Sequence, residues 1–229
     1  MSAGADSHVS LAEVLQTSLK ALEGTGLPAG IDQDSAENVA WLEARGLGGI
    51  AILARELERF GETVAWLPPD MDETRDGVVI TSEDASAVLL APGAVDFALG
   101  GAAVTIARCS APLLIAAEAA RRAPAGAGLT VSWGSGRNRS SARCGNGLAV
   151  LSLDIRTARQ TSDVTIRAGK PPSAKEGQRL AGFHAHSLRD GILADAPAWK
   201  TVKEAAARVL VPASAQSRGG AGAEVDDSA

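Results

Sequence analysis

The chain has 229 residues, of which 45% are hydrophobic and 21% charged, and its formal net charge is −5. This composition excludes a chain that is disordered throughout, because it holds enough apolar side chains for a core. Membrane spans are not expected, since the longest apolar stretch, Ala111–Ala120, is shorter than the roughly 18 residues that a span needs. Two cysteines, Cys109 and Cys144, are too few for a disulfide scaffold and favour a reduced, cytoplasmic protein.

The charge is distributed unevenly along the chain. Residues 1–100 hold 17 acidic and 5 basic side chains, whereas residues 101–229 hold 10 acidic and 17 basic ones. Either the two halves attract each other or the second half forms a basic groove for a small anionic ligand. Nucleic acid is not expected as a partner, because the chain is acidic overall and has no Tyr and only 3 Phe for base stacking.

The first sixty residues have the pattern of helices. Ser10, followed three residues later by Glu13, forms a capping box that opens the first amphipathic stretch. Two further amphipathic stretches follow, and each of the three ends at a glycine. The sequence therefore predicts packed helices over residues 10–61, preceded by a disordered tail over residues 1–9.

Residues 77–167 are rich in strands. Short β-branched and apolar runs are bounded here by Gly, Pro, Asn and Ser clusters. The runs are Val78–Ile80, Ala87–Leu90, Val104–Ile106, Leu129–Trp133, Leu148–Leu153 and Val164–Ile166. Residues Gly93–Leu99 and Leu113–Arg122 have helical patterns, and the short separators from residue 129 onward favour antiparallel pairing.

Asp195 followed by Pro197 predicts a final helix over residues 196–210. We therefore expect one α+β domain over residues 10–213, with a helical N-terminal third packed on a mostly antiparallel sheet and additional helices. Residues 214–229 are mostly small and form a C-terminal tail, which is either disordered or docked on the chain or a partner.

Two stretches carry a resemblance to a known family. They are Trp41–Gly46, with the sequence WLEARG, and Val211–Asp227, which begins VPASAQSR and ends in two acidic residues. Together they resemble a family of proteobacterial proteins of similar length and unknown function. The resemblance implies a bacterial, cytoplasmic protein linked to metabolism, and it transfers no catalytic residue.

A basic loop follows the strand that ends at Trp133. Ser135, Arg137, Arg139 and Arg143 lie among glycines, and two guanidinium groups can bind a carboxylate or a phosphate. The loop lacks the Lys-Ser/Thr pair of a nucleotide-binding P-loop. Either it is an anion site or it is a hairpin tip whose arginines are solvated.

The densest group of metal-ligand residue types is His184 and His186 with Asp190. In a strand the two histidines would share a face and could bind zinc or iron together with the carboxylate. The alternatives are loop histidines without a ligand, or a general base. The sequence identifies no cofactor.

The sequence leaves open whether the protein is an enzyme. The first expectation is a non-catalytic accessory or partner subunit of a bacterial metabolic enzyme, because few catalytic side chains are recognisable. The alternative is a small-molecule enzyme or an anionic-ligand-binding protein that uses residues 134–143 and the His184/His186 region. The partners expected are another protein or a second copy of the chain, and a small anionic ligand.

Overall fold

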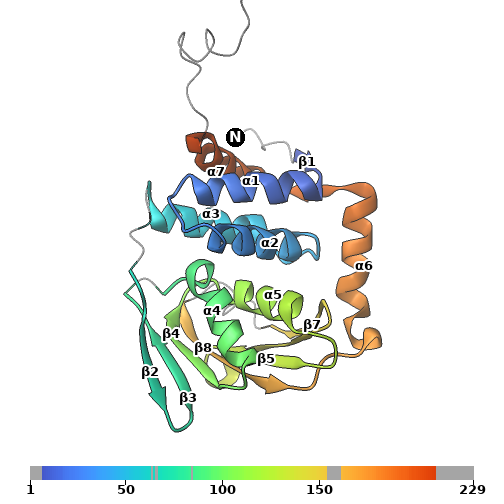
Figure 1. Ribbon diagram of the computed structural model, residues 1–229. Coiled ribbons are helices and arrows are strands. Elements are labelled where there is room, and N and C mark those ends of the chain that lie inside the picture. The colour runs from blue at the N-terminus through green and yellow to red at the C-terminus, as the bar shows by residue number, and fades with distance from the viewer. Residues whose placement is uncertain (1–6, 63, 65–66, 84, 154–160, 210–229) are drawn as a thin grey trace, which may run out of the picture.

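A computed structural model describes residues 7–62, 64, 67–83, 85–153 and 161–209. Helices are stacked in layers above a single large sheet, and one long helix runs along the side of the stack (Figure 1). The expected α+β class is confirmed. No helix in the described part of the chain is long and apolar enough to cross a membrane.

The upper layers hold four helices. They are α1 (Leu11–Glu23), α2 (Ile31–Glu43), α3 (Gly49–Phe60) and α7 (Ala196–Ala206). The three predicted N-terminal helices are thus present, and Ser10 Oγ accepts the expected capping hydrogen bond from the backbone N–H of Glu13 at 3.1 Å. α1 packs against α2 and α7, and α3 packs against the same two helices.

The main sheet has seven strands in the order β2-β3-β4-β8-β5-β6-β7. These are β2 (Asp70–Thr74), β3 (Gly77–Thr81), β4 (Val104–Cys109), β5 (Gly128–Trp133), β6 (Ser140–Gly145), β7 (Leu148–Ser152) and β8 (Ser162–Gly169). Only the β3–β4 pair is parallel. The prediction of a mostly antiparallel sheet is therefore confirmed.

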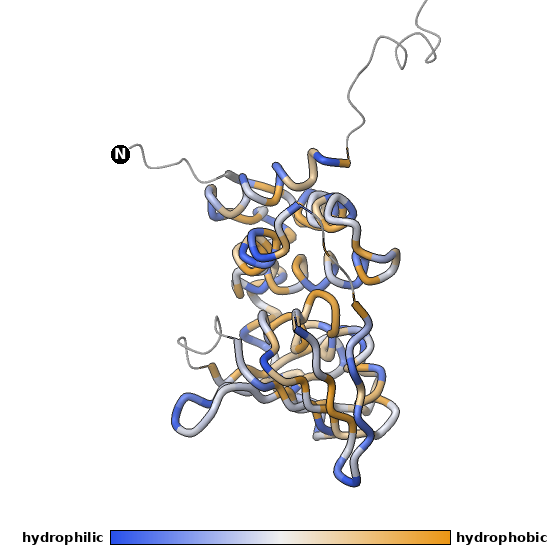
Figure 2. Tube along the Cα trace, turned by 90° about the vertical axis from the view of Figure 1, so that its left-hand side faces the viewer, coloured by the Kyte–Doolittle hydropathy of each residue, from blue (hydrophilic) through white to orange (hydrophobic). Residues whose placement is uncertain are grey.

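Two helices separate this sheet from the upper helices (Figure 1): α4 (Ala87–Leu99) and α5 (Pro112–Arg122). Their hydrophobic residues lie in the middle of the molecule, while hydrophilic residues gather at the loop tips (Figure 2). α4 begins where a strand, Ala87–Leu90, was expected, and Ser86 Oγ caps it by accepting from the N–H of Val88 at 3.2 Å. A run that is buried on all sides has no periodicity, so its sequence fits a strand as well as a helix.

The long lateral helix, α6 (Ala174–Asp190), was not predicted. Its sequence contains a start signal, because Ser173 and Glu176 form a complete capping box. The helix was hidden by its weak apolar pattern: Gly177 is its only buried residue. Since its sides are mostly exposed, the period of 3.6 residues is faint.

The chain ends also differ from expectation where they are described. Residues 7–9, predicted to be disordered, form β1 (Ser7–Val9), which pairs antiparallel with β9 (Ile192–Ala194). The predicted final helix appears as α7, and a short 3-10 turn, Ala207–Val209, follows it. The predicted tail, residues 214–229, lies outside the described residues.

Candidate functional site

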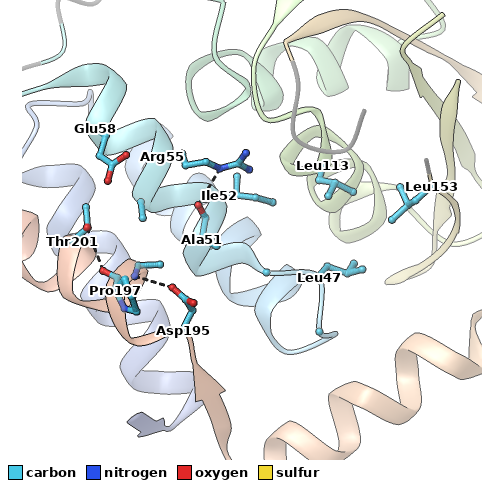
Figure 3. A pocket seen from close by; sticks show the side chains of 14 residues that line it. Leu47, Ala51, Ile52, Arg55, Glu58, Leu113, Leu153, Asp195, Pro197 and Thr201 are labelled. Carbon is cyan, nitrogen blue, oxygen red and sulfur yellow. Dashed lines mark hydrogen bonds between the residues drawn. The ribbon is translucent and has the colours of Figure 1, made fainter. Parts of the chain in front are cut away.

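A cavity of about 720 Å³ lies between α3, the start of α7 and the start of α5. Figure 3 shows Arg55 and Glu58 on the α3 wall and Asp195 at the start of α7. Leu113 of α5 and Leu153, just after β7, lie across from them (Figure 3). We call this the layer cavity, because it separates the upper helices from the α5 and sheet layers.

The connection between α2 and α3 forms one end of the layer cavity. Gly46 and Gly48 have φ angles of 69° and 71°, a left-handed conformation that glycine adopts without strain. At Gly49 a Cβ atom would lie 2.2 Å from the carbonyl oxygen of Val39. The tight turn and the close approach of the two helices therefore both depend on glycine, and together they place α3 against the cavity.

Two of the three charged side chains that line the layer cavity, Arg55 and Asp195, make hydrogen bonds within their own helices. Arg55 Nε donates to the carbonyl oxygen of Ala51 at 3.3 Å, within its own helix. Asp195 is the N-cap of α7, where its Oδ1 accepts from the N–H of Ala198 at 3.0 Å. The site thus offers one guanidinium that can bind an anion and two carboxylates, of Glu58 and Asp195, that can accept a proton.

A half-buried carboxylate, that of Glu43, interacts with Asp195. Glu43 Oε2 accepts a hydrogen bond from the N–H of Ile50 at 2.8 Å and so caps the first turn of α3. Burial raises the pKa of Glu43 above its ordinary value of 4.5, and the negative charge of Asp195 raises this pKa further. The two carboxylates therefore interact electrostatically. Asp195 lines the layer cavity, and Glu43 does not.

A second carboxylate anchors α3 from its other side. Glu56 Oε2 accepts hydrogen bonds from Ser86 Oγ at 2.5 Å and from Ser110 Oγ at 2.7 Å. Ser86 is the N-cap of α4, and Ser110 immediately precedes Ala111, the N-cap of α5. Arg108 and Ala111 have φ angles of 49° and 53°, which non-glycine residues rarely adopt. This junction fixes the wall of the layer cavity.

The layer cavity continues toward α6. A neighbouring cavity of about 550 Å³ shares Gly46, Leu47 and Leu153 with it, so the two adjoin there. Its other wall comes from α6, including Arg179 and Phe183. α6 therefore closes the far end of a groove that runs between the upper helices and the sheet.

The basic loop lies away from this groove. Ser135, Arg137 and Arg139 are exposed in the connection between β5 and β6, and none of them lines either cavity. Arg143, inside β6, pairs with Glu176 of α6 at 2.5 Å. Backbone and side-chain hydrogen bonds from Ser173, together with the bond from Arg143, lower the pKa of Glu176 to about 2. Arg143 thus connects β6 to α6 through an exposed ion pair, and it lines neither cavity.

The histidine cluster lies on α6, a helix and not a strand. Residues two apart on a helix diverge by about 200°, so His184 and His186 do not share a face. His186 Nδ1 lies 2.7 Å from Asp190 Oδ2 on the exposed side. His184 faces a third cavity, between α6 and the upper helices. Across the described residues, no three His, Cys, Asp or Glu side chains group as a metal site requires.

No pattern in the sequence marks the residues of the layer cavity as a functional site. Arg55 and Glu58 occupy the polar face of an amphipathic helix, where charged residues are ordinarily solvated. Asp195 was recognised only as a helix cap. Their proximity depends on how α3 and α7 pack, and neither helix indicates this by itself.

Comparison with known proteins gives a partial family match and a clear fold. Residues 9–87 match the model of a family described as a protein of unknown function (DUF3726). The resemblance to an uncharacterised family is thus supported over this range, which includes Trp41–Gly46 but not Val211–Asp227. No curated protein sequence matches the chain.

Several solved structures share the fold. Malate dehydrogenase from Pyrococcus horikoshii OT3 superposes with a TM-score of 0.64 at 10% identity, over 91% of this chain and 97% of that one. A dehydrogenase from Sinorhizobium meliloti gives 0.60 at 12% identity, over 87% and 99%. Sulfolactate dehydrogenase from Methanocaldococcus jannaschii gives 0.57 at 10% identity, over 87% and 96%.

The chain therefore has the fold of a group of dehydrogenases. This finding overturns the expectation of a non-catalytic accessory subunit, which depended on the scarcity of recognisable catalytic side chains. The alternative expectation, a small-molecule enzyme or anionic-ligand-binding protein, fits the fold better. Scarcity of motifs is a weak argument, because catalytic groups are brought together by the fold and not by sequence spacing.

Proposed function

We propose that the protein is an oxidoreductase that acts on a small organic acid bound in the layer cavity. The observation that carries the proposal is the position of Arg55 and two carboxylates around this cavity, in a fold shared with dehydrogenases. Two of these relatives are named for malate and sulfolactate, which are small hydroxy acids. A guanidinium is well suited to bind the carboxylate of such a molecule.

The chemistry assigns a role to each lining group. Oxidation of a hydroxy acid moves a proton from its hydroxyl group to a base and a hydride from its carbon to an acceptor, which leaves a carbonyl group. Arg55 holds the carboxylate, and Glu58 or Asp195 accepts the proton. The hydride acceptor has to be a soluble cofactor, because protein side chains do not accept hydride.

The adjoining cavity offers a place for that cofactor. Its volume of about 550 Å³ adds to the space in the layer cavity, and Arg179 on its wall is exposed. A nicotinamide dinucleotide carries phosphate charges that such a guanidinium binds. In this proposal Arg179 would hold the phosphates of the cofactor.

The test is an assay of the full chain with a series of 2-hydroxy acids and the matching 2-oxo acids, each with oxidised or reduced nicotinamide cofactors. Absorbance at the nicotinamide band reports turnover. We expect Arg55→Gln to raise KM for the acid by tenfold or more. Arg75→Gln, in the exposed β2–β3 turn, is the matched control and should leave KM unchanged.

Two results would contradict the proposal. Binding of an acid in the layer cavity without turnover would make the protein a ligand-binding protein. Turnover that is unaffected by Arg55→Gln would place the substrate elsewhere, and variants of Arg137 and Arg139 would then test the basic loop.

We further propose that the protein works in the cytoplasm of a bacterium. Supporting this setting, Cys109 and Cys144 are both buried and unpaired, as expected for thiols in a reducing compartment. Burial raises the pKa of Cys144 to about 12, so this thiol is inert toward nucleophilic chemistry at neutral pH.

A further inference from the structure

The third cavity, of about 490 Å³, is formed by α1, α2 and the residues just after it, α6, and Arg121 of α5. Its lining is mostly apolar, with Leu11 and Leu15 from α1, Trp41 from α2 and Leu188 from α6. Leu188 is 62% exposed, so part of this apolar lining is open to solvent. We call this cavity the side groove.

Arg45 lies on the wall of the side groove without a carboxylate partner among the described residues. Its guanidinium carbon lies 4.0 Å from the centroid of the Trp41 ring, and its Nη1 donates to the carbonyl oxygen of Trp41 at 3.1 Å. Burial alone lowers the pKa of Arg45 to about 10. A half-buried cation without a counter-ion is costly, and an anion in the groove would remove that cost.

The other charged groups of the groove do not supply this anion. Glu37 forms an ion pair with Arg121, and Arg121 also lies 3.3 Å from the buried Glu118. The charges of Glu37 and Arg121 are therefore already balanced by partners. His184 lies on the α6 wall, and burial and the charge of Arg45 both lower its pKa below 6.5. A neutral imidazole adds one hydrogen bond but no positive charge.

We propose that the side groove binds an amphipathic monocarboxylate, with its carboxylate on Arg45 and its hydrocarbon chain along Leu11, Leu15 and Leu188. A single unpaired cation matches one negative charge and not the two of a phosphate monoester. The apolar lining matches a chain that neither malate nor sulfolactate possesses, so this ligand is distinct from the proposed substrate. The side groove shares no lining residue with the layer cavity, whereas Arg45 also lines the neighbouring cavity of about 550 Å³. The binding proposed here does not rest on the oxidoreductase activity.

The test is titration calorimetry of the full chain with hexanoate, octanoate and decanoate. Each added CH2 group that enters the groove should tighten binding by roughly fourfold, because it removes further apolar surface from water. Decanol carries the chain without the charge and acetate carries the charge without the chain. Both should bind at least tenfold more weakly than decanoate, and equal binding of decanol and decanoate would overturn the proposal.

Two variants test the placement. Arg45→Met keeps an apolar chain beside Trp41 and should weaken decanoate binding by tenfold or more. Leu188→Ser changes an exposed residue, so the fold is preserved, and should weaken decanoate but not acetate. Arg75→Met, in the exposed β2–β3 turn, is the matched control. Unchanged decanoate affinity in both Arg45→Met and Leu188→Ser would show that the groove is not the site.

Discussion

Ser110 Oγ donates a hydrogen bond to Glu56 Oε2 at 2.7 Å, across 54 residues of sequence. The same oxygen accepts from Ser86 Oγ, so one buried carboxylate joins α3 to the starts of α4 and α5. This relationship connects the upper helices to the lower layers beside the layer cavity. Its strength therefore controls how firmly the cavity wall is held.

Replacing Ser110 with alanine should destabilise the protein. The change removes one donor from Glu56, which is only 6% exposed and cannot recover the bond from water. We expect the free energy of unfolding to fall by about 1–3 kcal/mol, measured by urea denaturation. Ser152→Ala, at an exposed strand end, should change it by less than about 0.5 kcal/mol. Equal effects of the two substitutions would contradict the role of the Glu56 junction.

Two glycine substitutions should act in opposite directions. Gly49→Ala places a Cβ atom 2.2 Å from the carbonyl oxygen of Val39, which is backbone and cannot rotate away. We expect a loss of about 1–3 kcal/mol or more as α2 and α3 separate. Gly93→Ala, inside α4 with nothing within 4 Å of its Cβ position, should gain about 0.5–1 kcal/mol. Thermal unfolding of the pair measures both, and a stabilised Gly49→Ala protein would refute the close crossing.

The coupling between Asp195 and Glu43 predicts a pH effect. Because the pKa of Glu43 is raised in the folded state, its contribution to stability is full below the ordinary value of 4.5 and is lost as pH rises through the raised pKa. Asp195→Asn removes the nearby charge and keeps a capping side chain, so the pKa of Glu43 should fall and this loss should shrink.

The measurement is the titration of the Glu43 carboxyl group by NMR, with urea unfolding at about pH 4 and about pH 7. Asp76→Asn, in the exposed β2–β3 turn, is the control. An unchanged Glu43 pKa in Asp195→Asn would show that the two carboxylates do not interact.

The contribution of Glu176 to stability should depend on pH in the opposite sense to that of Glu43. Its pKa of about 2 lies below the ordinary 4.5, so its contribution to stability is present above pH 4.5 and is lost as pH falls toward 2. Arg143→Gln should raise this pKa part of the way, because the hydrogen bonds from Ser173 remain. NMR titration of Glu176 checks the shift, and Arg167→Gln, on exposed β8 surface, should leave it unchanged. A Glu176 pKa that does not move in Arg143→Gln would mean that the ion pair does not persist in solution.

The sequence by itself determined the elements whose signals are local. Ser10 and Glu13 marked the start of α1, glycines marked the helix ends, and Asp195 with Pro197 marked the start of α7. The antiparallel strands after residue 128 followed from short separators, which leave no room for a crossover helix. These features depend on hydrogen bonds and side-chain periods within a few residues, so the chain specifies them before it folds.

Only the tertiary structure decided the rest. The run Ala87–Leu90 forms the first turn of α4, which packs against α2, α5 and the sheet, and these contacts are not visible in the sequence. His184 and His186 point in different directions because they lie on a helix, α6. The sequence did not predict this helix, because it has few buried residues and therefore only a faint apolar period. The layer cavity and the side groove are formed by residues from three or more elements each. In the sequence, Arg55 and Arg45 both resemble ordinary solvated arginines. Only the packing of the helices places each of them on a cavity wall, because long-range contacts leave no local pattern in the sequence.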